Sequence, residues 1–305
     1  MSGKGYALAL CALAALAALL SGCRRVGRGF TEEHEVPQPT PRAELNFRGR
    51  AGQVADAGIW DGLLKDYVRD GLVDYEAIRR DPRLWRYLRQ LGATNPKAIA
   101  SPQERLALLL NAYNCFVVEG VVKRWPLRSV RDFPEFFSEK SHKLGGIYIS
   151  LDEVEQLIRA LGEPRVHCAL VRGSRGDPTL RQEAYVGAAL DAQLESDCLE
   201  VINNPRWVRV DRERRTVYLA DFFREFLEDL RSRAEFPEEE LLDFIYDRLN
   251  SPRERDVLAL EDRHIEFLPH DWRINAGRFA RRPTATPAPE GERAARERKE
   301  GAGAR

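Results

Sequence analysis

The sequence lacks the motifs that assign many enzymes and metal-binding proteins by inspection. Its five cysteines include no C-x-x-C pair, which excludes a zinc knuckle and a thioredoxin-type motif. No P-loop, dinucleotide fingerprint or G-x-S-x-G nucleophile elbow is present. Neither sign of charge is in excess, since 48 Lys and Arg residues balance 48 Asp and Glu residues. This balance gives no reason to expect nucleic acid as a partner.

The first 23 residues instead predict a bacterial lipoprotein. Lys4 precedes an apolar run at positions 6–20, and the letters L-S-G-C end this region at Cys23. The pattern is typical of a signal peptide, residues 1–22, followed by a lipobox cysteine that is diacylated, for example with palmitate. The apolar run is shorter than the roughly 20 residues that span a bilayer, which argues against a plain transmembrane anchor.

Lipid on Cys23 predicts a localisation and one partner, the membrane. We expect the chain to be secreted across the inner membrane and to stay lipid-anchored in the cell envelope. Arg24, rather than aspartate, follows the cysteine, which favours the outer membrane with the protein facing the periplasm.

Composition divides the remaining chain into three segments. Residues 23–52 begin with the lipidated cysteine and contain prolines at 37, 39 and 41, which indicates a flexible tether. Residues 281–305 have no apolar side chain larger than alanine apart from proline, and we expect a disordered tail. Residues 53–280 contain no internal linker or repeat and should form one domain.

Helical patterns dominate this domain. Ser101 and Pro102 form a helix start, and the residues that follow are apolar nearly all round as far as Lys123, which predicts a buried central helix. Residues 142–149 and 207–219 each predict two short strands joined by a turn. The expected fold class is therefore α+β, a single mostly helical domain with short β-hairpins around the central helix.

His167 is the strongest candidate for acid–base chemistry, because it lies in an apolar segment beside a polar loop. Glu155 follows a predicted helix cap and is the candidate for orienting the imidazole, as a carboxylate does in hydrolases. Ser174 or Cys168 would be the nucleophile, with an activated water as the alternative. The competing interpretation makes His167 a structural residue that is satisfied in the core.

Three histidines do not show the spacing of a metal site along the chain. His142, His167 and His270 are far apart in sequence and only folding could bring them together. No metal and no other cofactor is expected.

Polar residues interrupt the predicted central helix. Asn111, Tyr113 and Asn114 lie there, and interior asparagine is costly to bury unpaired, so a hydrogen-bond network is expected. One interpretation has the asparagines bonding the backbone of the loop after His167 or of the segment at Trp272. The other makes them direct contacts to a ligand.

The loop at residues 172–177 is rich in arginine and glycine. Such a loop could hold an anion through arginine and backbone N–H groups, although it matches no phosphate-binding motif.

Six motifs keep a common order and spacing over about residues 55–276. They are N-A-Y-N at 111–114, G-G-I-Y-I-S-L-D-E-V-E at 145–155, P-R-V-H-C-A-L-V at 164–171, S-R-G-D-P-T-L-R-Q-E-A-Y at 174–185, L-D-A-Q-L at 190–194 and D-W-R-I-N at 271–275. Together they resemble the domain of unknown function 547 family. The resemblance implies a fold related to papain-like and transglutaminase-like cysteine hydrolases.

The sequence departs from the family pattern at the positions where thiol chemistry would lie. The family typically has C-A-S-R-G-C-P-P-L after the histidine segment, whereas Arg172 and Asp177 stand at the two cysteine positions here. Gln156 stands where a histidine often follows the matching glutamate. The resemblance implies that this chain has lost any chemistry that needs those cysteines.

The expected function is that of an envelope lipoprotein whose domain binds an unknown envelope protein or small-molecule ligand. A hydrolase or acyl-transferase of papain-like or transglutaminase-like type is the alternative, so whether the chain is an enzyme stays open. The expected binding residues are Asn111, Tyr113, Asn114, Arg165, Arg172, Asp177, Tyr185, Asp271, Trp272 and Asn275.

Overall fold

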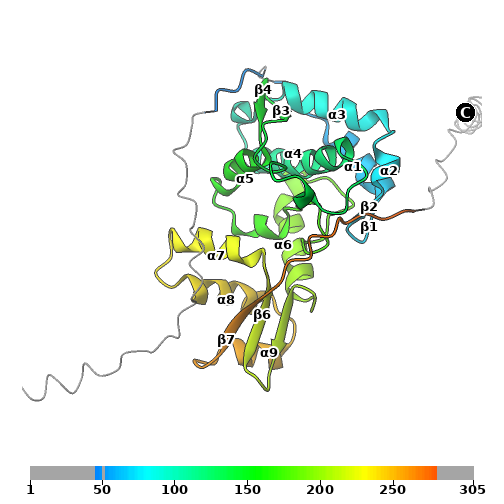
Figure 1. The fold of residues 1–305 in the computed structure, drawn as a ribbon. Helices are drawn as coiled ribbons and strands as arrows, with labels where there is room; N and C mark the ends of the chain where they lie inside the picture. Colours follow the sequence, from blue (N-terminus) through cyan, green and yellow to red (C-terminus); the bar gives the residue numbers. More distant parts are fainter. Residues whose placement is uncertain (1–44, 50–51, 280–305) are drawn as a thin grey trace, which may run out of the picture. The chain divides into compact units, whose positions relative to one another are not determined.

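The computed structural model describes residues 45–49 and 52–279. The chain divides into two units, Met1–Leu45 and Asn46–Arg305, and nearly all described residues belong to the second (Figure 1). The predicted signal peptide, the predicted lipid site at Cys23, most of the predicted tether and the predicted tail at 281–305 lie outside the described residues.

The second unit is built around the predicted central helix, α4 (Pro102–Lys123). Ser101 caps this helix by accepting a hydrogen bond from the N–H of Glu104, and Pro102 lies in its first turn. Every residue from Leu106 to Val122 is buried, which confirms the prediction. Among the described helices α4 is the one long and apolar enough to cross a membrane, but 94% of its apolar window is buried inside the protein.

Four helices from the same part of the chain contact α4. They are α1 (Ala57–Tyr67), α2 (Tyr75–Ile78), α3 (Pro82–Ala93) and α5 (Leu151–Arg159). In α1, Trp60, Leu63 and Leu64 are buried while the opposite face is exposed, as expected of an amphipathic helix. A short 3-10 helix, η1 (Pro96–Ala98), precedes α4, and η2 (Val130–Asp132) follows it.

Two small hairpins flank this helical part. Strands β1 (Val68–Arg69) and β2 (Leu72–Val73) pair directly after α1. Strands β3 (His142–Leu144) and β4 (Ile147–Ile149) pair around Gly145 and Gly146, both of which have positive φ. The second hairpin confirms the one predicted at 142–149.

A three-stranded sheet forms the other part of the unit. Strands β5 (Val208–Asp211) and β6 (Thr216–Ala220) make the second predicted hairpin, and β7 (His264–Leu268) pairs with β6 in parallel. This parallel pairing was not predicted, because β6 and β7 are separated by helices α7 (Phe223–Arg231), α8 (Pro237–Arg248) and α9 (Pro252–Leu258).

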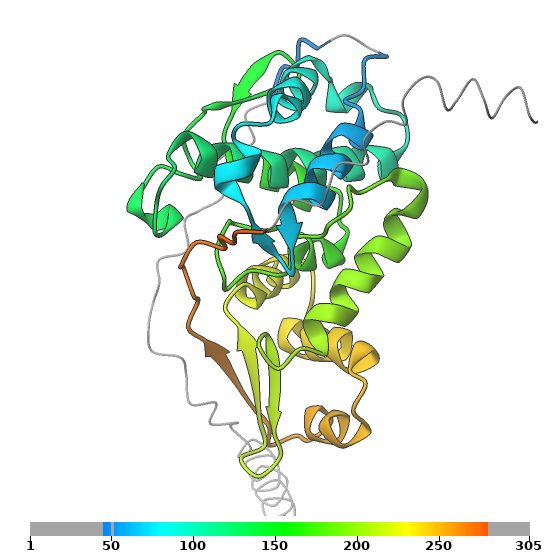
Figure 2. The same ribbon diagram turned by 90° about the vertical axis from the view of Figure 1, so that its right-hand side faces the viewer.

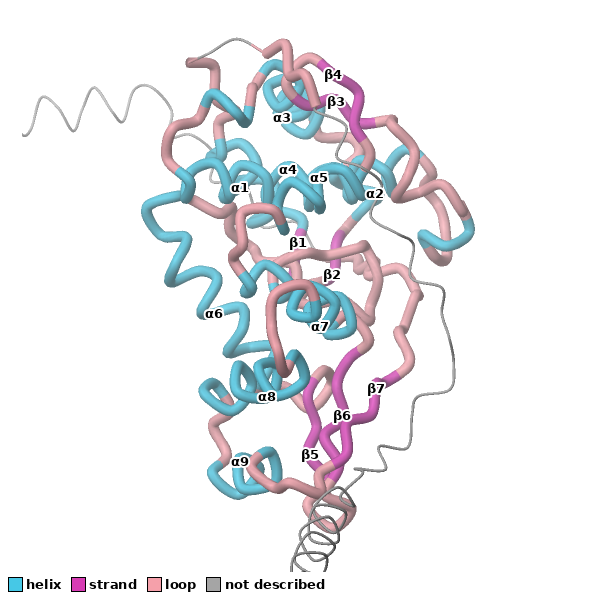
Figure 3. The backbone as a smooth tube through the Cα atoms, turned by 90° about the vertical axis from the view of Figure 1, so that its left-hand side faces the viewer, coloured by secondary structure: helices cyan, strands magenta, loops and turns pink. Residues whose placement is uncertain are grey.

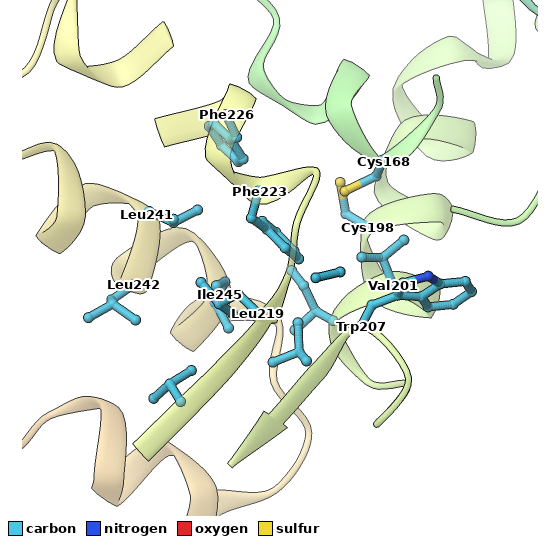
Figure 4. Close-up of a cluster of buried hydrophobic side chains, with 14 of the residues drawn as sticks. Cys168, Cys198, Val201, Trp207, Leu219, Phe223, Phe226, Leu241, Leu242 and Ile245 are labelled. Atoms are coloured by element: carbon cyan, nitrogen blue, oxygen red, sulfur yellow. The ribbon is translucent and has the colours of Figure 1, made fainter. Parts of the chain in front are cut away.

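Apart from the buried residues around α4, an apolar cluster fills the space between the sheet and its helices (Figure 4). It is here called the second apolar cluster. The long helix α6 (Leu190–Ile202) contributes Cys198 and Val201, while Trp207, Leu219 and Phe223 come from the segments that follow. Figure 2 shows α6 running from the helical part toward α8, and the two helices are in contact. The 3-10 helices η3 (Pro164–Cys168) and η4 (Gly187–Ala189) also contact α6.

After β7 the chain returns to the helical part as an extended segment, here called the C-terminal strap, residues 270–277 (Figure 3). The strap forms isolated antiparallel bridges with Ser129 and Ser174 and a parallel bridge with Val73. It therefore joins the first hairpin, the segment after α4 and the loop at 172–177. The predicted α+β class is confirmed, with the correction that one hairpin belongs to a larger sheet.

Candidate functional site

The loop at residues 172–177 is closed by the side chain of its own Asp177. Asp177 Oδ2 accepts hydrogen bonds from the backbone N–H groups of Arg172 (2.8 Å) and Ser174 (2.7 Å). Its other oxygen, Oδ1, has no hydrogen-bond partner and lies 3.5 Å from Nε2 of His270. Burial raises the pKa of Asp177, although the charges of Arg172 and His270 oppose this change.

The C-terminal strap covers this loop through backbone hydrogen bonds. The N–H groups of Arg175 and Gly176 donate to the carbonyl oxygens of Arg273 (2.8 Å) and Asp271 (2.9 Å). With Arg172 and Ser174 already bonded to Asp177, these four N–H groups have partners inside the protein. The anion site suggested by the loop composition is therefore not formed by these backbone groups.

Ser174 has His270 as its partner instead of His167. Ser174 Oγ lies 2.6 Å from His270 Nε2, and the Ser174 residue is only 3% exposed. Burial lowers the pKa of His270, so the ring is neutral at neutral pH and one ring nitrogen can accept a proton. The indole of Trp272 packs on this imidazole, with ring centroids 4.1 Å apart.

The arrangement of Ser174, His270 and Asp177 differs from a catalytic triad. In a triad the carboxylate holds the ring nitrogen opposite the one that faces the serine. Here Asp177 Oδ1 and Ser174 Oγ both approach Nε2 of His270. The cluster supplies a serine beside a neutral base, without a carboxylate that orients the base from the far side.

His167 occupies a separate, buried position in η3. Its Nε2 lies 2.9 Å from Oδ2 of Asp229 on α7, and its ring stacks on Phe226 with centroids 5.1 Å apart. Burial lowers the pKa of His167, which keeps the ring neutral, so we assign Nε2–H as the donor to Asp229. Asp229 also forms an ion pair with Arg159.

The carboxylate that contacts His167 is therefore that of Asp229. The prediction that Glu155 orients this imidazole is wrong. Glu155 Oε2 accepts a 3.4 Å hydrogen bond from the hydroxyl of Tyr113. Glu155 also lies within 3.8 Å of Arg172, whose guanidinium forms a closer ion pair with Glu225. Arg172, at a position where the resemblance implied a cysteine, thus links α5 to α7 by charge.

The asparagines of α4 hold the backbone of the segments packed against it. Asn111 donates to the carbonyl of Tyr185 at 2.8 Å and accepts from its N–H at 2.9 Å. Asn114 donates to the carbonyl of Ala169 and accepts from the N–H of Val171. The expected bonds to the loop after His167 are confirmed for Asn114, and both side chains are satisfied within the protein.

Two more of the expected binding residues contact acidic side chains of α6. Arg165 forms ion pairs with Glu163 at 2.8 Å and with Asp191 at 2.8 Å. The hydroxyl of Tyr185 donates to Asp197 at 2.8 Å, and burial raises the pKa of Asp197 to about 6.

The remaining expected residues belong to the strap. Asn275 accepts from the hydroxyl of Tyr75 at 2.7 Å and donates to the carbonyl of Gly71 at 3.0 Å. Asp271 pairs with the neighbouring Arg273 at 2.6 Å. Asn275 is buried, whereas Asp271 and Trp272 are partly exposed.

This arrangement can be compared with known proteins. Residues 98–202 match the family model described as "Protein of unknown function, DUF547". The DUF547 stretch is about a third of the chain and runs from the end of η1 to the end of α6. The match supports the resemblance over these residues. Neither the curated proteins nor the solved structures include a significant match to the chain.

The DUF547 stretch contains only part of the candidate site. His167, Glu155 and Ser174 lie inside it, whereas Asp229 and His270 lie outside it. The contacts of His167 with Asp229 and of Ser174 with His270 therefore each join the DUF547 stretch to a segment that follows it.

Sequence reasoning missed Asp229 altogether and gave His270 no partner. Asp229 is one of several acidic residues in α7, and nothing in their spacing singles it out. His270 did carry a signal, because it directly precedes Asp271 and Trp272 of a family-like motif.

The described residues, 45–49 and 52–279, contain no group of three or more His, Cys, Asp or Glu side chains arranged to hold a metal ion. The third histidine considered for such a site, His142, is buried beside Glu119, with Nδ1 2.6 Å from Oε2.

Proposed function

We propose that this protein is a lipid-anchored envelope protein whose domain binds an envelope protein or a small-molecule ligand and does not use His167 for hydrolysis. The observation that carries the second part is the environment of His167. The residue is 4% exposed, and its ring stacks on Phe226 and is hydrogen-bonded to Asp229, which is itself paired with Arg159. An imidazole enclosed in this way links η3 to α7 and is nearly inaccessible from solvent.

The anchoring part rests on the sequence at residues 1–23. An apolar run that ends in L-S-G-C is the pattern on which diacylation of a lipobox cysteine depends. The proline-containing tether that follows Cys23 would hold the domain away from the membrane surface.

Metabolic labelling with an alkyne analogue of palmitate tests the anchor in a bacterial host. We expect the wild-type chain to incorporate the label and to sediment with membranes, and Cys23→Ser to do neither. Equal labelling of wild type and Cys23→Ser, or no labelling of either, would show that Cys23 is not the lipid site.

Activity profiling tests the role given to His167. Purified protein is assayed against panels of peptides, esters and amides, with His167→Asn as the comparison and His264→Asn as a control at an exposed position. We expect the three proteins to have the same profile. A reaction that is lost in a folded His167→Asn protein but kept in His264→Asn would overturn the proposal.

A second candidate function, acyl transfer or hydrolysis through Ser174, is favoured by the 2.6 Å distance between Ser174 Oγ and His270 Nε2. Attack of Oγ on a carbonyl carbon would pass the hydroxyl proton to His270, which returns it to the leaving group as an acyl-serine forms. The papain-like version has less support, because Cys168 is buried and its surroundings raise the pKa of its thiol. Strap residues would have to move, since Ser174 is nearly inaccessible.

A fluorophosphonate probe distinguishes this candidate from the binding proposal. A serine activated by His270 should be labelled in the wild-type protein and in Ser196→Ala, an exposed control, but not in Ser174→Ala or His270→Gln. Absence of label on wild-type Ser174 would exclude a serine nucleophile there.

A further inference from the structure

Two of the three described cysteines lie side by side in the second apolar cluster (Figure 4). Cys168 ends η3 and Cys198 lies in α6, and these two elements pack against each other. Cys198 Sγ donates to the carbonyl oxygen of Arg165 at 3.9 Å, so the thiol of α6 lies against η3, the element that Cys168 ends. Two cysteines on elements that pack together, with their side chains side by side, are placed as a disulfide bond requires.

We propose that Cys168 and Cys198 form a structural disulfide bond when the chain folds in an oxidising compartment. Two S–H bonds break and one S–S bond forms. The two electrons and two protons pass to a disulfide oxidant, either a protein disulfide or oxidised glutathione, which is reduced to two thiols. The setting rests on the export proposed above, but the reaction itself does not.

The timing of this reaction follows from burial. Cys168 and Cys198 are 1% and 0% exposed, and the neighbouring Cys198 thiol and burial raise the pKa of Cys168. Because the thiolate is the reactive form, the folded dithiol reacts slowly with an oxidant. The bond therefore forms before the domain closes, and burial then shields it from reductants.

The disulfide bond would close a covalent loop in the chain, and this loop would contain part of the candidate site. Ser174, Asp177 and Tyr185 all lie between Cys168 and Cys198 in sequence. Cys115 on α4 is the remaining described thiol; it is buried near Glu119 and burial raises its pKa, so we expect it to stay reduced.

Counting thiols tests the proposal. The full chain with Cys11→Ser and Cys23→Ser, held in detergent, keeps only three cysteines. It is refolded in a glutathione redox buffer, denatured, alkylated with a maleimide and weighed by mass spectrometry. We expect one alkylated thiol without reduction and three after reduction. When the oxidant is added to protein that has already folded in the reduced state, we expect the two thiols to become resistant to alkylation more slowly.

Variants and peptide mapping assign the pair. Cys115→Ala should change the counts to zero without reduction and two with it, whereas Cys198→Ala should give two in both cases. Proteolytic mapping of the unreduced starting protein should recover a linked peptide that contains Cys168 and Cys198. Three free thiols after oxidative refolding, or a linked peptide that contains Cys115, would overturn the proposal. Failure of palmitate labelling at Cys23 would leave these counts unchanged, so the two proposals fail separately.

Discussion

His167 and Asp229 are 62 positions apart in sequence, and their side chains meet at 2.9 Å between η3 and α7. Burial tends to raise the pKa of Asp229, but the hydrogen bonds from His167 and Arg159 outweigh it and the pKa is lowered. The carboxylate therefore stays charged beside a neutral imidazole. This contact fastens the DUF547 stretch to the helix that covers the second apolar cluster.

The buried histidine predicts a loss of stability in mild acid. Because the pKa of His167 is lowered below its ordinary value of 6.5, the unfolded chain binds a proton more readily than the folded one as pH falls. This contribution to stability is present above about pH 6.5 and is lost as pH falls through the lower pKa of the folded protein. We expect the melting temperature to fall between about pH 7.5 and about pH 5.

Removing the titrating group should flatten this dependence. His167→Asn keeps a short side chain that can donate to Asp229, so we expect a lower melting temperature at neutral pH and a smaller fall in acid. His264→Asn, at an exposed position, should follow the wild type. Equal slopes for wild type and His167→Asn would show that another group, such as His270, controls the acid response.

Asn111 is predicted to be one of the most sensitive polar residues in the core. Asn111→Ala leaves both the N–H and the carbonyl of Tyr185 without their partner in a buried place. We expect unfolding by urea to require about 3 kcal/mol less free energy than in the wild type.

Asn250→Ala is the matched control, since this asparagine is exposed. Its effect should stay within about 0.5 kcal/mol. A comparable loss in both variants would mean that the hydrogen bonds of Asn111 to the Tyr185 backbone contribute no more than an exposed asparagine side chain does.

The close approach of the strap to the loop makes Gly176 sensitive to a single methyl group. A Cβ on Gly176 would lie 2.8 Å from the backbone nitrogen of Asp271 and 2.8 Å from Nε2 of His270. We expect Gly176→Ala to cost about 2 kcal/mol and to increase proteolysis of the strap.

Gly62→Ala tests whether any glycine-to-alanine change has this effect. Gly62 lies in α1, where a Cβ meets only the flexible end of Arg83 at 3.2 Å. Alanine is the better helix former, so this variant should be unchanged or stabilised by up to about 1 kcal/mol.

Asn275 is predicted to hold the far end of the strap. Asn275→Ala removes the side-chain bonds to Tyr75 and Gly71, so the backbone bond from the N–H of Val73 to the carbonyl of residue 275 should open more often. Hydrogen exchange at Val73 should accelerate at least about tenfold, which corresponds to about 1.4 kcal/mol. Arg278→Ala, at an exposed position just beyond the strap, should leave this exchange rate unchanged.

Much of the fold was predictable because its signals are local. The cap at Ser101 and the all-round apolar pattern identify α4, and Gly145–Gly146 identifies the turn between β3 and β4. The need of buried asparagines for partners was also predictable, since the cost of an unpaired amide does not depend on the fold. The parallel pairing of β7 with β6 was not, because neither strand carries information about a neighbour that far along the chain.

The sequence alone predicts the α+β class, the central helix, the family resemblance and a lipid site at Cys23. Only the tertiary structure shows which side chains lie together. Asp229 lies beside His167, His270 beside Ser174 and Cys198 beside Cys168. Residue type shows that a buried imidazole or thiol needs a partner, and several acids and histidines in the chain could serve. Only packing brings one of them within reach.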